Sequence, residues 1–223
     1  MRIVQTLILS TFILLFSIEA GATHIVGGVI NYVYNGNGNY TFTMRIYRDC
    51  TSSTQFDGAV GSSTPAALVS IFPDNSTISV LDFQLTNPAV QSVNPPINNQ
   101  CLVIPPNVCV EEGTYTWNAN IPNGNVGYYV VYERCCRNGS INNLLNPGAQ
   151  GGTYWAYIPP RNTQGNNSNP VFNNFPPLFI CQNAPLLFNH SATDPDGDSL
   201  VYELCDPFQG ASQASPAPAP SAP

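Results

Sequence analysis

Three aspartates at alternate positions are the residues of this chain whose spacing most directly suggests a chemistry. Asp194, Asp196 and Asp198 share a short segment with Pro195 and Gly197, immediately before an apolar run. Ca²⁺ is a hard cation that takes several oxygen ligands, and a tight turn can converge three carboxylates on one point. Without a cation these carboxylates would repel one another. The pattern therefore predicts a structural calcium ion bound by the three aspartates.

The same run is also typical of an ordinary solvated turn, since Asp, Gly and Pro are common turn residues. It does not fit an EF-hand. With Asp194 as the first loop position, Ser199 stands where the invariant glycine belongs and Cys205 where the bidentate glutamate belongs. A cadherin-like site shared between a loop and a neighbouring domain fits better, and Glu203 would add a ligand only if its strand faced the loop.

Cysteine spacing favours disulfides over a metal site, because zinc sites need closely paired ligands such as C-x2-C. We expect Cys101 to bond to Cys109, because Pro105 and Pro106 bend the loop between them. The adjacent pair is expected to reach two different strands, because a ring closed between neighbours is strained. The odd count implies a free thiol or a partner outside this sequence. The cysteines are Cys50, Cys101, Cys109, Cys135, Cys136, Cys181 and Cys205.

Enzymatic alternatives depend on the histidines, which are His24 and His190. A catalytic thiol at Cys135 or Cys136 would need one of them as a base. If export exposed His24 as the first residue, it could form a copper centre with His190 and a tyrosine, as in an oxidative polysaccharide-cleaving enzyme. Common hydrolase, metalloprotease and nucleotide-binding motifs do not occur. The chain is therefore predicted not to be an enzyme.

The first 22 residues read as a cleaved signal peptide. Arg2 precedes an apolar stretch, and Ala20 and Ala22 satisfy the signal peptidase, so the mature chain is expected to begin at Thr23. The apolar stretch is shorter than the roughly 20 residues of a membrane-spanning helix. We expect an extracellular or outer-surface location and no membrane span. The formal net charge of -7, with no Lys and no cluster of Arg, argues against a nucleic-acid partner.

Alternating apolar and polar residues predict a chain made of strands. Residues 27–34 and 40–47 should pair as a hairpin around an Asn- and Gly-rich turn, with Phe42, Met44 and Ile46 facing a core. Trp117 and Trp155 are interpreted as core residues, the alternative being a sugar-stacking platform. The predicted fold is all-β, an Ig-like antiparallel β-sandwich. Further strands are expected over residues 67–72, 77–85, 113–121, 127–133 and 153–158.

Composition divides the chain into four parts. The signal peptide (1–22) is followed by a disulfide-bonded β-sandwich domain (23–169). Residues 170–211 are predicted to be the incomplete start of a second, cadherin- or PKD-like β-sandwich with a strand over 200–204. Residues 212–223, rich in Pro and Ala, are expected to be an extended linker that does not pack. We therefore expect the chain to be part of a longer protein.

Five segments together resemble the N-terminal region of large secreted Bacteroidetes surface proteins. They are residues 22–28 (ATHIVGG), 46–50 (IYRDC), 132–139 (YERCCRNG), 170–177 (PVFNNFPP) and 190–198 (HSATDPDGD). Such proteins continue into PKD- or cadherin-like repeats and end in a gliding-motility-associated C-terminal sorting domain. The resemblance implies export by Sec and then by the type IX system.

The predicted function is a non-enzymatic secreted or cell-surface module for adhesion or surface assembly. Its expected partners are other surface proteins or polysaccharides. Two alternatives remain open: a carbohydrate-binding module, indicated by exposed Trp117 or Trp155 side chains in one plane, and the copper oxidase that His24 would require.

Overall fold

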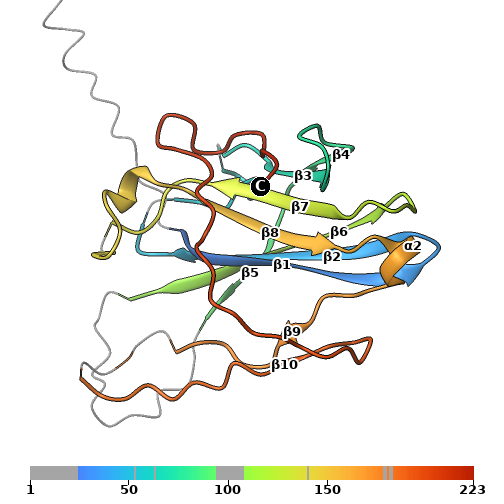
Figure 1. Ribbon diagram of the computed structural model, residues 1–223. Coiled ribbons are helices and arrows are strands. Elements are labelled where there is room, and N and C mark those ends of the chain that lie inside the picture. Colours follow the sequence, from blue (N-terminus) through green and yellow to red (C-terminus); the bar gives the residue numbers. More distant parts are fainter. Residues whose placement is uncertain are drawn as a thin grey trace, which may run out of the picture.

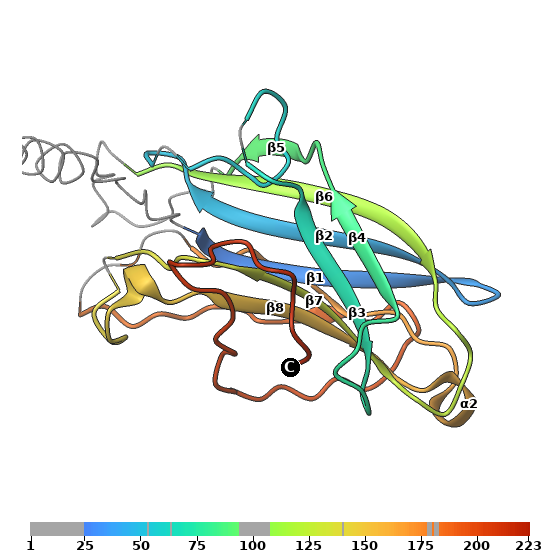
Figure 2. The same cartoon turned by 90° about the horizontal axis from the view of Figure 1, so that it is seen from above.

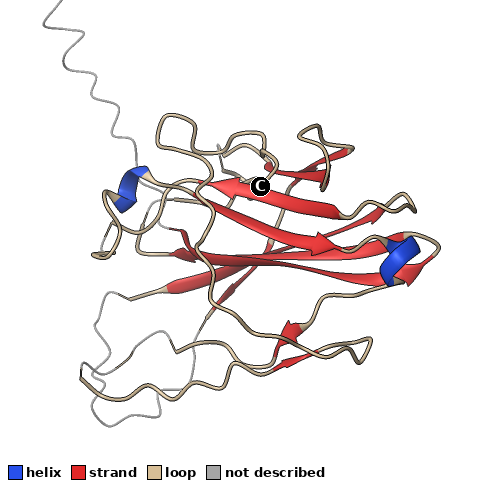
Figure 3. Cartoon of the chain, viewed as in Figure 1, coloured by secondary structure: helices blue, strands red, loops and turns tan. Residues whose placement is uncertain are grey.

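The computed structural model describes residues 25–223 except 53, 63, 94–107, 140, 178–179 and 181–182. Strands form two four-stranded antiparallel sheets that pack face to face (Figures 1 and 3). The first sheet has the order β1 (Ile25–Gly36), β2 (Asn39–Asp49), β6 (Val110–Asn120), β5 (Ala89–Ser92). The second has the order β4 (Leu81–Leu85), β3 (Ala67–Pro73), β7 (Tyr128–Arg134), β8 (Gly152–Ile158). The predicted all-β antiparallel sandwich is confirmed.

The β1–β2 hairpin follows from local turn chemistry. Gly36 pairs with Asn39, so the loop has two residues, and both take positive φ angles, 53° at Asn37 and 80° at Gly38. Positive φ at both central positions defines a type I′ turn, whose twist matches that of the flanking strands. The predicted hairpin is therefore confirmed.

The core lies between the sheets and is rich in aromatic side chains. Phe42 and Met44 of β2 are fully buried, and the Trp117 ring stacks on Phe42 with 5.1 Å between centroids. Val69 and Val130 complete the core from the second sheet. The alternation predicted for residues 40–47 and the core position of Trp117 are confirmed.

Two predicted strands differ from the structure. Of residues 77–85 only Leu81–Leu85 form a strand, because Ser76 Oγ bonds the Ile78 N–H and turns the chain before it. Residues 200–204 form no strand, and Val201 and Leu204 are almost fully exposed. An apolar run forms a strand only when a partner strand pairs with it, and no strand of the described residues pairs with residues 200–204.

The chain after β8 closes the open edge of the first sheet. Beyond helix α2 (Arg161–Gln164), the Asn169 N–H donates to the Tyr32 carbonyl (2.9 Å), and Tyr32 N–H donates back to Asn169 Oδ1 (3.1 Å). Ser168 Oγ accepts from the Tyr34 N–H at 3.2 Å. These bonds satisfy polar groups of edge strand β1 that would otherwise offer a template for another chain.

Beyond this edge, the chain forms a two-stranded ribbon on the outer side of the first sheet. Strands β9 (Val171–Phe172) and β10 (Ala192–Thr193) pair antiparallel and lie below β1 and β5 in Figure 1. Phe175 contacts Tyr47 of β2 with 5.1 Å between ring centroids. A short 3-10 helix, η1 (Pro147–Ala149), lies at the end of the sandwich opposite α2.

Both disulfides among the described residues differ from the predicted pairing. Cys50 bonds to Cys109, with 5.3 Å between Cα atoms, so the Cys101–Cys109 prediction is wrong; Cys101 itself lies outside the described residues. The two residues follow and precede paired strands, and the Cys50 N–H donates to the Cys109 carbonyl at 3.1 Å. Cys135 and Cys136 bond to each other across a cis peptide, not to two separate strands. The Cys50–Cys109 bond depends on the pairing of β2 with β6, and the spacing of the cysteines in the sequence gives no information about that pairing.

Candidate binding surfaces

The three predicted calcium ligands lie on one turn after β10. Asp194 Oδ1 accepts the backbone N–H groups of Asp196 (2.9 Å) and Asp198 (3.1 Å), and Gly197 takes φ 83°. The Asp196 carboxylate accepts the Ser168 N–H and so ties the turn to the segment beside β1. Over the part of the chain that the structure describes, no three His, Cys, Asp or Glu side chains are grouped as metal ligands. The calcium site stays a prediction.

Calcium binding is tested by replacing Asp196 with Asn. With Kd values of about 0.1–1 mM, as in extracellular modules, about 10 mM calcium should stabilise the native state by roughly 1.4–2.7 kcal/mol over chelator. We expect a higher melting temperature with calcium, and a smaller rise in Asp196→Asn. The exposed Asp206→Asn is the matched control. Equal melting temperatures with calcium and with chelator would leave the three aspartates as an ordinary turn.

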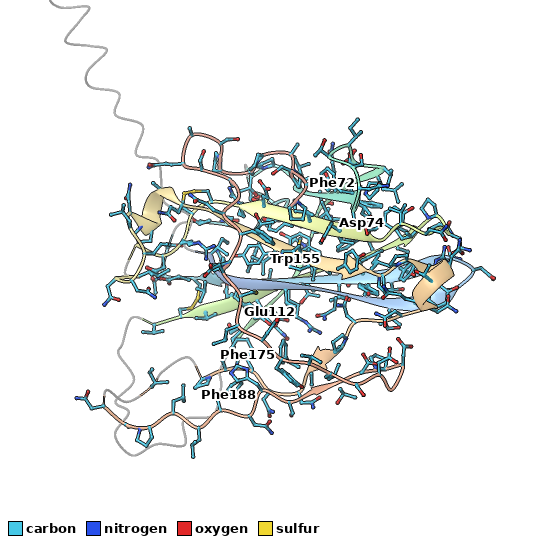
Figure 4. All side chains as sticks on the ribbon, viewed as in Figure 1. Phe72, Asp74, Glu112, Trp155, Phe175 and Phe188 are labelled. Carbon is cyan, nitrogen blue, oxygen red and sulfur yellow. A yellow bond between two sulfur atoms is a disulfide. The ribbon has the colours of Figure 1, made fainter. Side chains whose placement is uncertain are left out.

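Trp155 lies on the outer face of β8, contrary to the core interpretation. Its side chain is 40% exposed and meets the Tyr129 ring edge-on, at 5.6 Å and 69° (Figure 4). Strand alternation explains the difference, because Ala156 and Ile158 occupy the inward positions of β8. Phe208 packs on Trp155 at 5.8 Å and an angle of 56°. The rings are tilted and do not form the single plane expected of a sugar-stacking platform.

Residues 208–221 dock on this outer face with a tight turn over residues 212–215, where Ser212 and Ser215 exchange two backbone hydrogen bonds of 3.1 Å. We call them the docked segment; they cross the outer side of β7 and β8 (Figures 1 and 2). The Thr153 N–H donates to the Phe208 carbonyl (3.2 Å), and the Cys135 N–H donates to the Pro216 carbonyl (2.9 Å). The expectation that residues 212–223 would not pack is therefore wrong. Proline lacks an N–H but keeps its carbonyl, so a Pro-rich chain can still accept these bonds.

Glu133 is the central contact of the docked segment. Its side chain lies on β7, and the residue is only 6% exposed. One carboxylate oxygen accepts Ser221 Oγ (2.7 Å) and the Ser221 N–H (3.3 Å), and the other accepts the Ala211 N–H (3.2 Å). Gly210 permits the close approach, because a Cβ there would lie 2.5 Å from the Glu133 carboxyl carbon. A buried carboxylate whose bonds come from one segment is a strong anchor.

A buried ion pair lies beneath the docked segment. Arg134 Nη2 is 2.9 Å from Asp57 Oδ1, and the Tyr132 hydroxyl donates to Asp57 Oδ2 at 2.9 Å. Burial raises the pKa of Asp57, and the Arg134 charge and the Tyr132 hydrogen bond oppose that rise. Arg134 Nη1 also donates to the Pro216 carbonyl at 2.8 Å, so one side chain joins core and docked segment.

Sequence reasoning did not identify Glu133, Arg134 or Asp57. One signal was present: Tyr128, Val130 and Tyr132 alternate toward the core, and Arg134 occupies the next inward position of the same strand. A charge at a core-facing position requires a buried partner. His190, the base considered for catalysis, packs against Phe188 with 4.4 Å between ring centroids. His24 lies outside the described residues.

No family model, curated protein or solved structure matches this chain. Among the described residues, no helix has the length and apolar character needed to cross a membrane.

Proposed function

We propose that this chain is a non-enzymatic module of an extracellular or outer cell-surface protein, serving adhesion or surface assembly. The observation that carries the proposal is the docked segment, a Pro-rich stretch of chain held on the outer face of β7 and β8. The Cys50–Cys109 disulfide supports the location, because such bonds persist in oxidising compartments. The resemblance to secreted Bacteroidetes surface proteins implies the same location.

The contacts to the docked segment suit recognition of a Pro-rich segment that contains a turn. Most are hydrogen bonds to backbone groups, at Phe208, Ala211 and Pro216, and so depend on the path of the backbone more than on side-chain identity. Segments rich in Pro lose less conformational entropy on binding, because proline restricts their backbone before binding. A face of this kind accepts a similar segment from another chain, which is what surface assembly requires.

The anchoring role of Glu133 is tested by Glu133→Gln, which keeps the shape and removes the charge. Charged hydrogen bonds are stronger than neutral ones by about 1 kcal/mol, so we expect the Ala211 and Ser221 amides to exchange about fivefold faster. Glu203→Gln, at an exposed position, is the matched control. Unchanged exchange at both amides in Glu133→Gln would show that Glu133 does not hold the segment.

Assembly itself is tested with a fluorescent peptide that copies residues 206–223. The chain's own segment competes at an effective concentration of about 1 mM, so wild type should bind the peptide weakly. Gly210→Ala should displace its own segment, leave the face intact and bind the peptide more tightly, and adding Glu133→Gln should reverse that gain. Equal, negligible binding to wild type and Gly210→Ala would contradict assembly through this face.

A further inference from the structure

A polar cavity opens at the end of the sandwich where the β1–β2 turn, the end of β6 and helix α2 meet. Its volume is about 470 Å³, within the range of small-molecule sites. Its lining differs from that of most such sites, because side-chain amides predominate over apolar groups. The amides come from three separate stretches of chain, and they are those of Asn37, Asn120, Asn123 and Asn166.

Arg161 contributes the positive charge of this cavity and is held in place by its surroundings. Its Nη2 donates to the Ile121 carbonyl at 2.7 Å, and the guanidinium lies 5.7 Å from the Tyr34 ring centroid and 6.0 Å from that of Tyr40. Gly38 makes room for it, since a Cβ there would lie 3.1 Å from Nη2. A guanidinium fixed in this way presents its remaining donors in a constant direction.

The polar side chains of the cavity are largely unpaired within the described part of the chain. Among the described residues Arg161 forms no salt bridge, whereas Arg45, Arg48 and Arg134 each face a carboxylate. The side-chain amides of Asn37, Asn123 and Asn166 likewise form no hydrogen bond within the described part of the chain. A preorganised cation and unengaged amides therefore line one cavity.

We infer that this cavity binds a saccharide that carries a carboxylate, such as a uronic acid unit of an acidic polysaccharide. Arg161 pairs with the carboxylate in the planar fork geometry that guanidinium groups favour. Amide side chains offer both donors and acceptors, which matches hydroxyl groups that both donate and accept. The net charge of -7 opposes an anion only at long range, because salt at physiological strength screens charges beyond about 8 Å. The site is independent of the docked segment.

The test is calorimetric titration of the full chain with oligogalacturonate, with neutral galacto-oligosaccharide and acetate as comparison ligands. We expect oligogalacturonate alone to bind at physiological salt and to shift the NMR signals of the Asn37, Asn123 and Asn166 side-chain amides. Binding of acetate with equal affinity would show a simple carboxylate site and overturn the saccharide assignment. Equal binding of the neutral sugar would overturn the role of the carboxylate.

Two variants localise the site. Arg161→Lys keeps the charge but loses the fork, and should weaken oligogalacturonate binding about tenfold, since hydrogen bonds to charged groups contribute about that factor. Asn123→Asp places a carboxylate on an exposed loop of the cavity and should weaken binding by repulsion without disturbing the fold. Asn143→Asp makes the same charge change on an exposed loop beside η1, at the far end of the sandwich, and should leave binding unchanged. No binding to wild type, or equal binding to all variants, would overturn the inference.

Discussion

Replacing Arg134 with Met is expected to lower the free energy of unfolding by about 3–5 kcal/mol. The substitution leaves the Asp57 carboxylate buried without its cation, and Asp57 is only 2% exposed. Removing one partner of a buried pair costs more than the pair contributes, because the remaining charge cannot be solvated. The bond from Arg134 to the Pro216 carbonyl is lost as well, so the docked segment should loosen. Chemical denaturation followed by tryptophan fluorescence measures the change.

The pH dependence distinguishes this cause from simple loss of packing. Burial already raises the pKa of Asp57 in the folded state, so protonation of Asp57 favours folding. This stabilisation is fully present below the pKa of Asp57 in the unfolded chain. It is lost as the pH rises through the pKa of Asp57 in the folded state. Without the Arg134 charge, the pKa of Asp57 in the folded state rises further, so stability continues to fall up to a higher pH. The stability deficit of Arg134→Met relative to wild type should therefore grow as pH rises above the ordinary pKa of an aspartate.

Two further variants serve as controls for the ion pair. Asp57→Asn combined with Arg134→Met removes both charges and should recover part of the lost stability. Arg45→Met breaks the 3.7 Å pair with Glu112, in which the Arg45 side chain is 39% exposed. The Glu112 side chain is only 11% exposed but keeps its hydrogen bonds from Gln91 and Thr114, so the loss should cost no more than about 1 kcal/mol. A deficit for Arg134→Met as small as that for Arg45→Met, or independent of pH, would contradict the account.

Local chemistry explains what could be predicted of this fold from sequence. The Asn37–Gly38 turn requires positive φ at both positions, and the alternation of Phe42, Met44 and Ile46 defines a buried face. The hairpin and the sandwich followed from such short-range signals. Trp155 was misplaced because its strand carries large apolar residues on both faces, so alternation alone does not indicate which face is inside.

Contacts between distant parts of the chain account for what sequence reasoning missed. The docked segment depends on Glu133, which lies 78 residues from Ala211 and 88 from Ser221. The composition of residues 212–223 predicts an extended linker, but it contains no sign of the turn at residues 212–215 or of the buried carboxylate that receives the segment. The same holds for the Arg161 cavity, whose amides come from three stretches of chain that only the fold brings together.

Removing the Cys50–Cys109 bond is expected to lower the free energy of unfolding by about 4 kcal/mol. The bond spans 59 residues in sequence, so the reduced unfolded chain regains a large conformational freedom that the cross-link denies it. The native state should change little, because Asp49 and Val110 remain paired in the sheet beside it and Arg48 remains bonded to Glu111 at 2.7 Å. The double variant Cys50→Ser/Cys109→Ser should therefore keep its circular dichroism spectrum at room temperature.

Denaturant titration separates an effect on the unfolded state from a damaged native state. Loss of a cross-link expands the unfolded chain, so the midpoint should fall while the m-value rises, since m follows the surface exposed on unfolding. Cys205→Ser, at an exposed cysteine without a disulfide in the structure, is the matched control and should behave as wild type. A double variant as stable as Cys205→Ser would contradict the bond in solution. A lower midpoint with a reduced m-value would instead show that the variant has lost native structure where β2 ends and β6 begins.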